Sequence, residues 1–199
     1  MSKGIVIAIS GPSGTGKGTV VEELIRKNPN IFLSISATTR SPREGEEDGR
    51  EYYFLSKEDF LNRLENGEML EHNFYCGNYY GTPLSEVEKR LEDGNDVLLE
   101  IDVNGVMQVK EKLPVVTVFL LPPSKDELYC RLCGRGTESE EVIACRIKES
   151  LCELKRIESY DYAIVNDDLN SAVSKILAVI MAEKCKTKQN KDLWGEMIK

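Results

Sequence analysis

The chain has 199 residues, of which 41% are apolar and 30% are charged, and its formal net charge is −8. This length and composition are typical of one globular domain with its own core, which excludes a disordered or low-complexity protein. The 34 acidic residues outnumber the 26 basic ones, so the chain lacks the diffuse positive field by which proteins bind a polynucleotide.

The sequence also argues against a membrane or secreted protein. The longest apolar runs, residues 115–121 and 176–182, fall far short of the roughly 18 residues that a membrane span needs. The apolar stretch 4–9 is too short for a secretory signal and runs into a Gly-Pro turn. The six cysteines lie mostly inside helical patterns, which fits a reducing compartment. We expect a cytoplasmic protein without a membrane partner.

Apolar runs of strand length alternate along the chain with longer stretches of helical periodicity. The predicted strands are residues 5–10, 31–36, 69–74, 96–102, 115–121 and 162–165. The predicted helices are residues 19–27, 56–67, 82–94, 106–112, 124–134, 138 to about 159, and 172–183. Strands that alternate with helices predict an α/β fold, in which a parallel sheet is covered on both faces. Ligands of such sheets bind at the carboxyl ends of the strands.

A glycine-rich segment follows the first predicted strand. Its residues are Gly11, Pro12, Ser13, Gly14, Thr15, Gly16, Lys17, Gly18 and Thr19. Glycines let consecutive backbone N–H groups turn toward one anion, the helix N-terminus adds its dipole, and the lysine reaches the outer phosphates of a nucleotide. The segment predicts a nucleoside triphosphate site. Gly18 stands where the general pattern has a serine or threonine for Mg²⁺, so the metal is held by Thr19, directly or through water, or mainly by the nucleotide.

Two arginines in the polar stretch 38–50 suggest a second phosphate site. Arg40 and Arg43 precede the tyrosine pair at 52–53, and a second tyrosine pair stands at 79–80. An arginine fork can bind two phosphate oxygens and a tyrosine hydroxyl can donate a third bond. Arginines in a glycine-rich loop are also common on a solvated surface, and that interpretation stays open beside the first.

A third cluster is formed by Arg131, Arg135 and Arg146, around the glycines at 134 and 136. A mobile segment that carries arginines would suit phosphoryl transfer, because that reaction depends on positioning, charge stabilisation and exclusion of water. Two surface helices with ordinary salt bridges explain the same pattern.

Several motifs together point to one family. They are Gly11-Pro12-Ser13-Gly14, Thr38-Thr39-Arg40-Ser41-Pro42-Arg43, Gly45-Glu46, Gly77-Asn78-Tyr79-Tyr80-Gly81-Thr82, Glu100-Ile101-Asp102, Arg135-Gly136-Thr137 and Val165-Asn166-Asp167-Asp168-Leu169. Through them nearly the whole chain resembles the guanylate kinase family. The resemblance implies ATP-dependent phosphorylation of GMP and dGMP to GDP and dGDP by direct in-line transfer, in purine nucleotide metabolism and with Mg²⁺ accompanying ATP.

The resemblance also implies three lobes. A P-loop kinase core, with a parallel sheet and helices on both faces, spans about 1–36, 83–125 and 157–199. A small GMP-binding α+β insert spans about 37–82, and a helical lid spans about 126–156.

Residue roles follow from the same resemblance. The ATP site consists of Gly11, the loop residues from Ser13 to Thr19, and Asn166 and Asp167 near the adenosine. The GMP-binding residues are Ser36, Arg40, Arg43, Glu46, Tyr52, Glu71, Tyr80, Thr82 and Asp102. Among them, Arg40, Arg43, Tyr52 and Tyr80 hold the phosphate, while Ser36, Glu71, Thr82 and Asp102 face the guanine. The catalytic residues that stabilise the transferring phosphoryl group are Lys17, Arg43, Arg135 and Arg146.

Two other interpretations compete with the enzyme. A noncatalytic guanylate-kinase-like interaction module would typically have lost phosphate-loop residues, whereas Lys17 is intact. A zinc site would use the Cys-x-x-Cys pair at 130 and 133 with the cysteines at 145 and 152, but helical spacing favours packing residues there. His72 is not expected to be catalytic, because the attacking atom is an oxygen of GMP. A monomer and a homodimer both fit the sequence.

Overall fold

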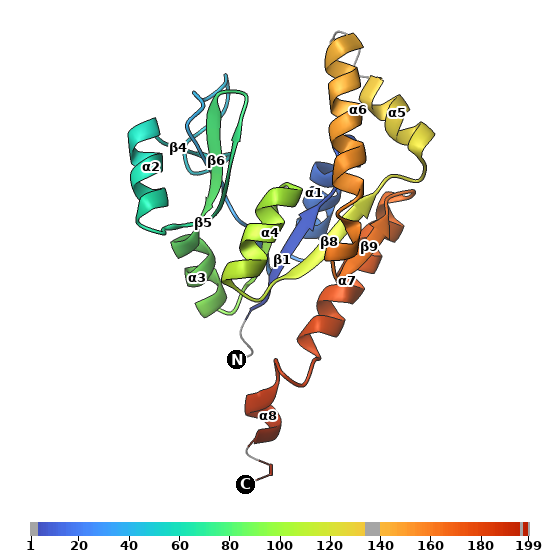
Figure 1. Cartoon of the computed structure of the whole chain (residues 1–199). Helices are drawn as coiled ribbons and strands as arrows, with labels where there is room; N and C mark the ends of the chain where they lie inside the picture. The colour runs from blue at the N-terminus through green and yellow to red at the C-terminus, as the bar shows by residue number, and fades with distance from the viewer. Residues whose placement is uncertain (1–3, 134–139, 196, 199) are drawn as a thin grey trace.

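The computed structural model describes residues 4–133, 140–195 and 197–198. Its main sheet has five parallel strands in the order β2-β7-β1-β8-β9 (Figure 1). The strands are β1 (Val6–Ser10), β2 (Ile31–Leu33), β7 (Asp96–Glu100), β8 (Val116–Leu121) and β9 (Tyr162–Val165). Parallel neighbours need crossover connections, and helices supply most of them. The α/β fold expected from the sequence is confirmed.

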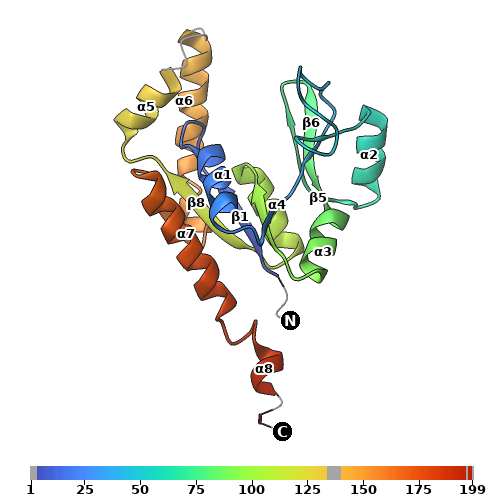
Figure 2. The same ribbon diagram turned by 180° about the vertical axis from the view of Figure 1, so that it is seen from behind.

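The main sheet buries both of its faces. Ile7 and Ile9 of β1 belong to a core with residues of α1 (Lys17–Lys27) and α7 (Leu169–Lys184), which lie together in Figure 2. Val6 and Ala8 of β1 belong to a separate core with residues of α3 (Leu84–Glu92) and α4 (Val103–Lys112). Successive side chains of a strand point to opposite faces, so an unbroken apolar run is what a doubly covered strand requires.

A second, smaller sheet has the strand order β4-β3-β6-β5. Its strands are β3 (Ala37–Thr38), β4 (Tyr53–Phe54), β5 (Met69–Tyr75) and β6 (Asn78–Pro83). Strands β5 and β6 form an antiparallel hairpin whose two turn residues, Cys76 and Gly77, have φ angles of 49° and 81°. Positive φ at both positions matches the right-handed twist of the hairpin strands.

Helix α2 (Lys57–Glu65) covers this second sheet. Its N-cap is Ser56, whose hydroxyl accepts a hydrogen bond from the backbone N–H of Asp59 (3.0 Å). Phe60 of the helix is fully buried and packs with Ala37 and Met69 in a small core of its own. The second sheet and α2 therefore form a separate lobe, at the left of Figure 1.

Helices α5 (Lys125–Cys133) and α6 (Glu140–Leu154) stand on the other side of the main sheet from this lobe (Figure 1). A 3₁₀ turn, η1 (Ile157–Ser159), leads from α6 into β9, and α8 (Lys191–Gly195) extends beyond the end of α7. None of the described helices is long and apolar enough to cross a bilayer.

Several predicted boundaries are wrong. The helices predicted from 106 and from 172 begin three residues earlier, at Val103 and Leu169. The strand predicted at 31–36 ends at Leu33, because the chain leaves the main sheet there and enters the second sheet at Ala37. The helix predicted from 82 begins at Leu84, because Thr82 and Pro83 still pair with β5. The helix predicted to reach about residue 159 ends at Leu154, where the following two N–H groups bond to carbonyls three residues back.

The sequence prediction also lacks four elements, β3, β4, β6 and α8. The strands β3 and β4 have two residues each, and α8 has five. Such short segments do not repeat often enough to show a hydrophobic period. The predicted start of the sixth helix at 138 lies outside the described residues.

Candidate active site

The loop between β1 and α1 contains glycines that no other residue could replace without strain. Gly11 and Gly16 have φ angles of 148° and 83°. A Cβ atom on Gly11 would lie 2.3 Å from the Leu120 carbonyl oxygen, and one on Gly16 would lie 2.8 Å from Nδ2 of Asn166. The buried hydroxyl of Thr15 donates to the carbonyl of Pro12 (2.9 Å). The loop conformation is therefore fixed by glycine geometry and by hydrogen bonds within the loop.

Lys17, the first residue of α1, folds back over this loop. Its Nζ donates to the carbonyl oxygens of Gly11 (2.6 Å) and Pro12 (3.1 Å). Burial lowers the pKa of Lys17, and the negative charges of Glu153, Glu100 and Asp102 partly oppose that shift. A desolvated ammonium at the mouth of a loop rich in positive-φ glycines is suited to the outer phosphates of a nucleotide.

Two hollows meet at Lys17. The first, of about 820 Å³, lies between the second sheet and α6, and its lining includes Tyr52, Glu71 and Glu153. The second, of about 790 Å³, lies over the loop and the start of α7. Ser13, Lys17 and Glu100 line both hollows. Each hollow has the volume of a small-molecule site, so the structure can hold two ligands with Lys17 between them.

The residues predicted to face the guanine lie at one end of the first hollow. Ser36, Glu71 and Asp102 line it, and the hydroxyl of Thr82 donates to Oε1 of Glu71 (2.7 Å). Burial raises the pKa of Glu71 to about 7, although the Thr82 hydrogen bond works in the opposite direction. Three of the four predicted residues therefore line one hollow, and the fourth, Thr82, contacts the buried Glu71 carboxylate.

Gly105 is part of this arrangement and was not predicted. A Cβ atom at this position would lie 2.7 Å from Oε2 of Glu71. The Gly105 N–H also donates to Oδ1 of Asp102 (2.7 Å), which caps α4. Gly105 therefore leaves the space that the Glu71 carboxylate occupies. Its signal in the sequence is a glycine in the first turn of a helix, where helix propensity disfavours it.

The predicted phosphate-binding residues are only partly assembled. Tyr52 and Tyr80 line the first hollow, with their rings edge to face and 6.2 Å apart. Arg40 does not line it, because its guanidinium pairs with both carboxylate oxygens of Glu46 (2.8 and 2.9 Å). Arg43 is exposed and also lies outside the hollow lining, while its backbone N–H donates to Glu46 (2.7 Å).

Glu46 therefore accepts hydrogen bonds from both arginines of its own segment, residues 40–46, which we call the arginine segment. The hydrogen bond from Arg40 is the main reason that the pKa of Glu46 lies well below its usual range, at about 2. The guanidinium of Arg40 also lies over the ring of Tyr52, 5.2 Å from its centroid. Glu46 and Tyr52 hold Arg40 beside the hollow rather than in it.

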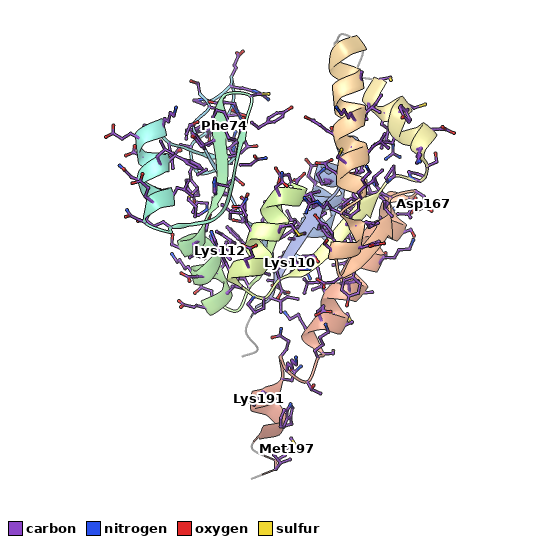
Figure 3. The ribbon with its side chains drawn as sticks, in the orientation of Figure 1. Phe74, Lys110, Lys112, Asp167, Lys191 and Met197 are labelled. Carbon is purple, nitrogen blue, oxygen red and sulfur yellow. The ribbon has the colours of Figure 1, made fainter. Side chains whose placement is uncertain are left out.

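The second hollow contains the remaining loop residues and the predicted adenosine-binding residues. Gly14, Gly16, Gly18 and Thr19 line it together with Asn166 and Asp167. Asn166 is buried, and its Nδ2 donates to the Thr15 carbonyl (2.8 Å). Asp167 is exposed at the end of β9 (Figure 3). The structure thus connects Asn166 directly to the loop, a contact that the sequence did not predict.

The segment predicted to form a lid, about residues 126–156, lies only partly within the described residues. Arg131 of α5 lines the second hollow and pairs with Glu127 (2.8 Å). Arg135 lies outside the described residues, and so does the side chain of Arg146, whose backbone belongs to α6. Cys130 and Cys133 lie in one helix, as predicted, and both are exposed. Within the described residues no group of three or more His, Cys, Asp and Glu side chains could hold a metal ion.

Sequence reasoning missed several residues that line the first hollow. Glu100 ends β7, so its place at the carboxyl edge of the sheet is the signal that could have found it. Glu149, Glu153 and Arg156 come from α6 and the turn after it. Glu149 and Glu153 are four residues apart and so lie on one face of α6, and that spacing is visible in the sequence.

Comparison with known proteins identifies the family of this chain. The family model for guanylate kinase matches residues 2–183. The guanylate kinase of Desulfitobacterium hafniense is 50% identical over 187 residues, covering 94% of each protein. That of Caldanaerobacter subterraneus subsp. tengcongensis is 52% identical over 193 residues, covering 96% of this chain and 94% of the relative.

A solved structure of the same family also matches this chain. The crystal structure of guanylate kinase from Anaplasma phagocytophilum matches with a TM-score of 0.75 at 36% identity, covering 94% of this chain and 89% of that chain. The match covers residues 2–183 rather than a single motif, and the chain therefore belongs to the guanylate kinase family.

Proposed function

We propose that this protein phosphorylates GMP and dGMP with ATP, producing GDP or dGDP and ADP. The observation that carries the proposal is the meeting of two nucleotide-sized hollows at Lys17. One hollow contains the loop for the triphosphate, and the other contains a buried carboxylate suited to a guanine base. The transferred group would then lie beside the lysine between them.

The base is recognised by Glu71. Guanine presents two adjacent donors, the ring N–H at position 1 and the amino group at position 2, and an ionised carboxylate can accept from both. Adenine has no N–H at position 1 and no 2-amino group, so AMP would leave the buried carboxylate unpaired. Thr82 and Gly105 hold the Glu71 carboxylate in place, and Ser36 and Asp102 share the same hollow.

The reaction needs no nucleophilic side chain. An oxygen of the GMP phosphate attacks the γ-phosphorus of ATP, while the bond from that phosphorus to the β–γ bridging oxygen breaks and ADP leaves. Charge builds up on the transferring group, and fixed cations in a site closed to water stabilise it strongly. Lys17 supplies the first of these cations.

The electrostatics of the first hollow explain why further cations are needed. Glu100, Asp102 and Glu153 all act on Lys17, so the unliganded site balances its ammonium with carboxylates. Two polyanionic nucleotides would be repelled by such a site. We expect Arg40 and Arg43 to move in with the GMP lobe, and Arg135 and Arg146 to move in with the lid.

Mg²⁺ fits the oxygen donors at the junction of the hollows. The hydroxyl of Thr19 and the carboxylate of Glu100 line the second hollow, and oxygen ligands are those that Mg²⁺ prefers. Thr19 would hold the ion directly or through water. When bound, the ion neutralises phosphate charge on ATP.

We infer a cytoplasmic location and small-molecule partners only. The five described cysteines are unpaired, which fits a reducing compartment. The net charge of −8 does not suit a polynucleotide partner. A monomer and a homodimer remain the two candidate states.

The test is a coupled assay of ADP production from ATP with GMP, AMP, CMP or UMP as the acceptor. We expect rapid turnover with GMP and little with AMP. The variant Lys17→Met, purified in the same way, excludes a contaminating kinase. Equal or faster turnover with AMP would contradict the proposal.

A further inference from the structure

The last segment of the chain, residues 185–199, projects from the end of α7, and we call it the arm. Figures 1 and 3 show α8 of this arm below the main sheet, away from the second lobe and from α5 and α6. The hydrogen bonds described for residues 187–197 join residues of the segment 184–197 only. The arm is therefore held by its own hydrogen bonds rather than by the core.

The base of the arm is fixed to the main sheet. Nζ of Lys184 donates to both carboxylate oxygens of Asp96 (2.9 Å each), and Asp96 is buried at the start of β7. Within the arm, Asn190 donates to the Lys184 carbonyl (2.7 Å), and Nε1 of Trp194 donates to the Thr187 carbonyl (3.0 Å). The arm thus leaves the body in a defined direction, and the indole ring has a defined orientation.

Exposed apolar side chains gather on the arm and on the adjoining end of α7. The described residues include eight large apolar side chains that are exposed, and four of the eight lie between residues 181 and 198. Met181 is 70% exposed, Trp194 37%, Met197 84% and Ile198 75%. Met197 lies near the far end of the arm in Figure 3. Such a gathering of exposed apolar side chains marks an interaction surface.

Helix α7 continues this apolar surface toward the body. Its residues 176–182 are all apolar. Ile176 and Ile180 belong to the core, whereas Ala178, Met181 and Ala182 are exposed. A helix that is apolar on every side is normally covered on every side, and alanines leave room for a second helix to approach closely. Within the described part of the chain, nothing covers this face of α7.

The arm and the body carry opposite charges. The arm has four lysines and two acidic residues, a formal charge of +2, and because the whole chain carries −8, the remaining 184 residues carry −10. The arm points away from its own body, so the acidic surface that it can meet belongs to another molecule. A second copy of this chain supplies that acidic surface together with an identical apolar face on α7.

A lipid bilayer fits this surface less well than a second copy does. A helix that lies on a bilayer has a wide apolar face opposite a strongly charged one. Between Leu169 and Ala182, α7 has only one charged residue, Lys175. Its exposed apolar face consists of two alanines and one methionine, which suits a helix partner.

We propose that the exposed face of α7 around Met181 and the arm form a two-fold interface with a second copy of this chain. In a two-fold interface both copies use the same patch. The two α7 faces pack on each other, and each arm extends over the acidic body of the other copy. None of the described residues from 178 to 198 lines either hollow, so each copy keeps its own site.

The test measures the mass of the full-length protein by sedimentation velocity between about 1 and 100 μM. We expect wild type to be a dimer and Met181→Glu to raise the dissociation constant at least about thirtyfold, because an unpaired charge would be buried in the interface. Met181 is exposed in the single copy, so this variant should fold, and circular dichroism checks that it does. The matched control is Tyr129→Glu, which places the same charge on another exposed apolar residue of a helix and should leave the dimer unchanged.

Two further measurements address the arm. Trp194→Ala should weaken the dimer about tenfold, since a tryptophan at the centre of an interface carries much of its binding energy. Raising NaCl from 0.05 to 0.5 M should weaken the wild-type dimer about fivefold, because salt screens the attraction between arm and body.

Three results would overturn the proposal. The first is a wild-type protein that stays monomeric up to 100 μM. The second is a dimer that only one, or neither, of Met181→Glu and Trp194→Ala weakens. The third is sedimentation of wild type, but not of Met181→Glu, with vesicles of phosphatidylcholine and phosphatidylserine, which would assign the surface to lipid. None of these outcomes depends on the proposed kinase activity.

Discussion

The phosphate-binding loop and the arginine segment 40–46 would bind the same chemical group, but they are built in different ways. In the loop, positive-φ glycines shape the backbone, and Lys17 is hydrogen-bonded across it. In the arginine segment, Arg40 is paired with Glu46, and Arg43 is exposed outside the hollow. Backbone groups take their positions when β1 and α1 form, whereas long side chains take theirs from whichever partner is present.

We infer that one end of the candidate active site is preformed and that the other would be completed by its ligand. A preformed site stabilises a transition state without reorganisation, and a site completed on binding can exclude water as it closes. The following predictions test the two ends, in order of decreasing effect.

Lys17→Met tests the preformed end and should have the largest effect. It replaces the ammonium by an uncharged chain of similar length, and we expect kcat to fall roughly a hundredfold or more. The control is Lys27→Met in the same helix, where the side chain pairs with Glu23 on the surface. Both variants should show cooperative unfolding close to that of wild type. A Lys17→Met enzyme with half the wild-type activity would disprove the role of the loop.

Glu71→Ala tests the proposed base-binding part of the first hollow, where Glu71 is already held by Thr82. We expect kcat/KM for GMP to fall roughly 10- to 100-fold, because two hydrogen bonds to a buried charged acceptor are lost. IMP uses only the ring N–H, so its smaller efficiency should fall less. Steady-state kinetics with both substrates measure this difference. Equal losses for GMP and IMP, or no loss for either, would mean that the carboxylate does not read the base.

The pH dependence of GMP binding should follow the Glu71 carboxylate, whose pKa is about 7. Below pH 7 the group becomes mostly protonated and loses acceptor capacity, so KM for GMP should rise by about fivefold between pH 7 and pH 6. The phosphate of GMP ionises in the same pH range. Glu71→Gln is the control, because any pH dependence of KM that remains in this variant comes from the phosphate. If wild type and Glu71→Gln have parallel pH profiles, Glu71 does not titrate in this range.

Glu71 should also make the folding stability depend on pH, but in the opposite direction to GMP binding: lowering the pH should stabilise the fold while it weakens binding. Because the pKa of Glu71 is raised from 4.5 to about 7, the folded protein binds more protons than the unfolded chain in that window, and stability falls as the pH rises through it. Glu71→Gln cannot ionise and keeps an oxygen that accepts the Thr82 hydroxyl. At pH 8 it should exceed wild type in free energy of unfolding by up to about 3 kcal/mol, and at pH 4 the difference should vanish. Urea titrations at the two pH values measure the difference.

A measurement of domain closure tests whether ligand binding assembles the arginines that lie outside the first hollow. We expect the radius of gyration to decrease when an ATP analogue and GMP bind together, because Arg43, Arg135 and Arg146 come from separate segments and must approach one phosphoryl group. Either nucleotide alone should produce a smaller change. Small-angle scattering measures it, and an unchanged profile with both ligands would contradict closure.

Glu46→Gln should have the smallest effect. The substitution removes the charge that orients Arg40 beside Tyr52 and the first hollow, so Arg40 would have to be ordered by the substrate phosphate instead. We expect KM for GMP to rise only about two- to fivefold, since partly exposed ion pairs contribute little. The GMP-to-IMP ratio should not change, because Glu46 does not face the base. A loss as large as that of Glu71→Ala would mean that Glu46 contacts the substrate itself.

The strands of the main sheet and the phosphate-binding loop could be predicted from the sequence, apart from the end of β2. The strand predicted at 162–165 coincides with β9, and the glycines of the loop lie between β1 and α1 as predicted. These features depend on local properties. Apolar runs specify a doubly covered strand, and glycine positions specify where φ is positive, so neighbouring residues carry the whole signal.

Which side chains meet in the first hollow could not be predicted from the sequence, because it depends on tertiary packing. Asn73 and Asp102 are 29 residues apart, and their hydrogen bond depends on how α4 lies against β5. That placement is held by Gln108, which bonds both backbone groups of His72, and by Lys112 (Figure 3), which donates to the Met69 carbonyl (2.8 Å). Local periodicity describes each element separately, whereas these contacts arise from the packing of two elements whose relative position no short stretch of sequence specifies.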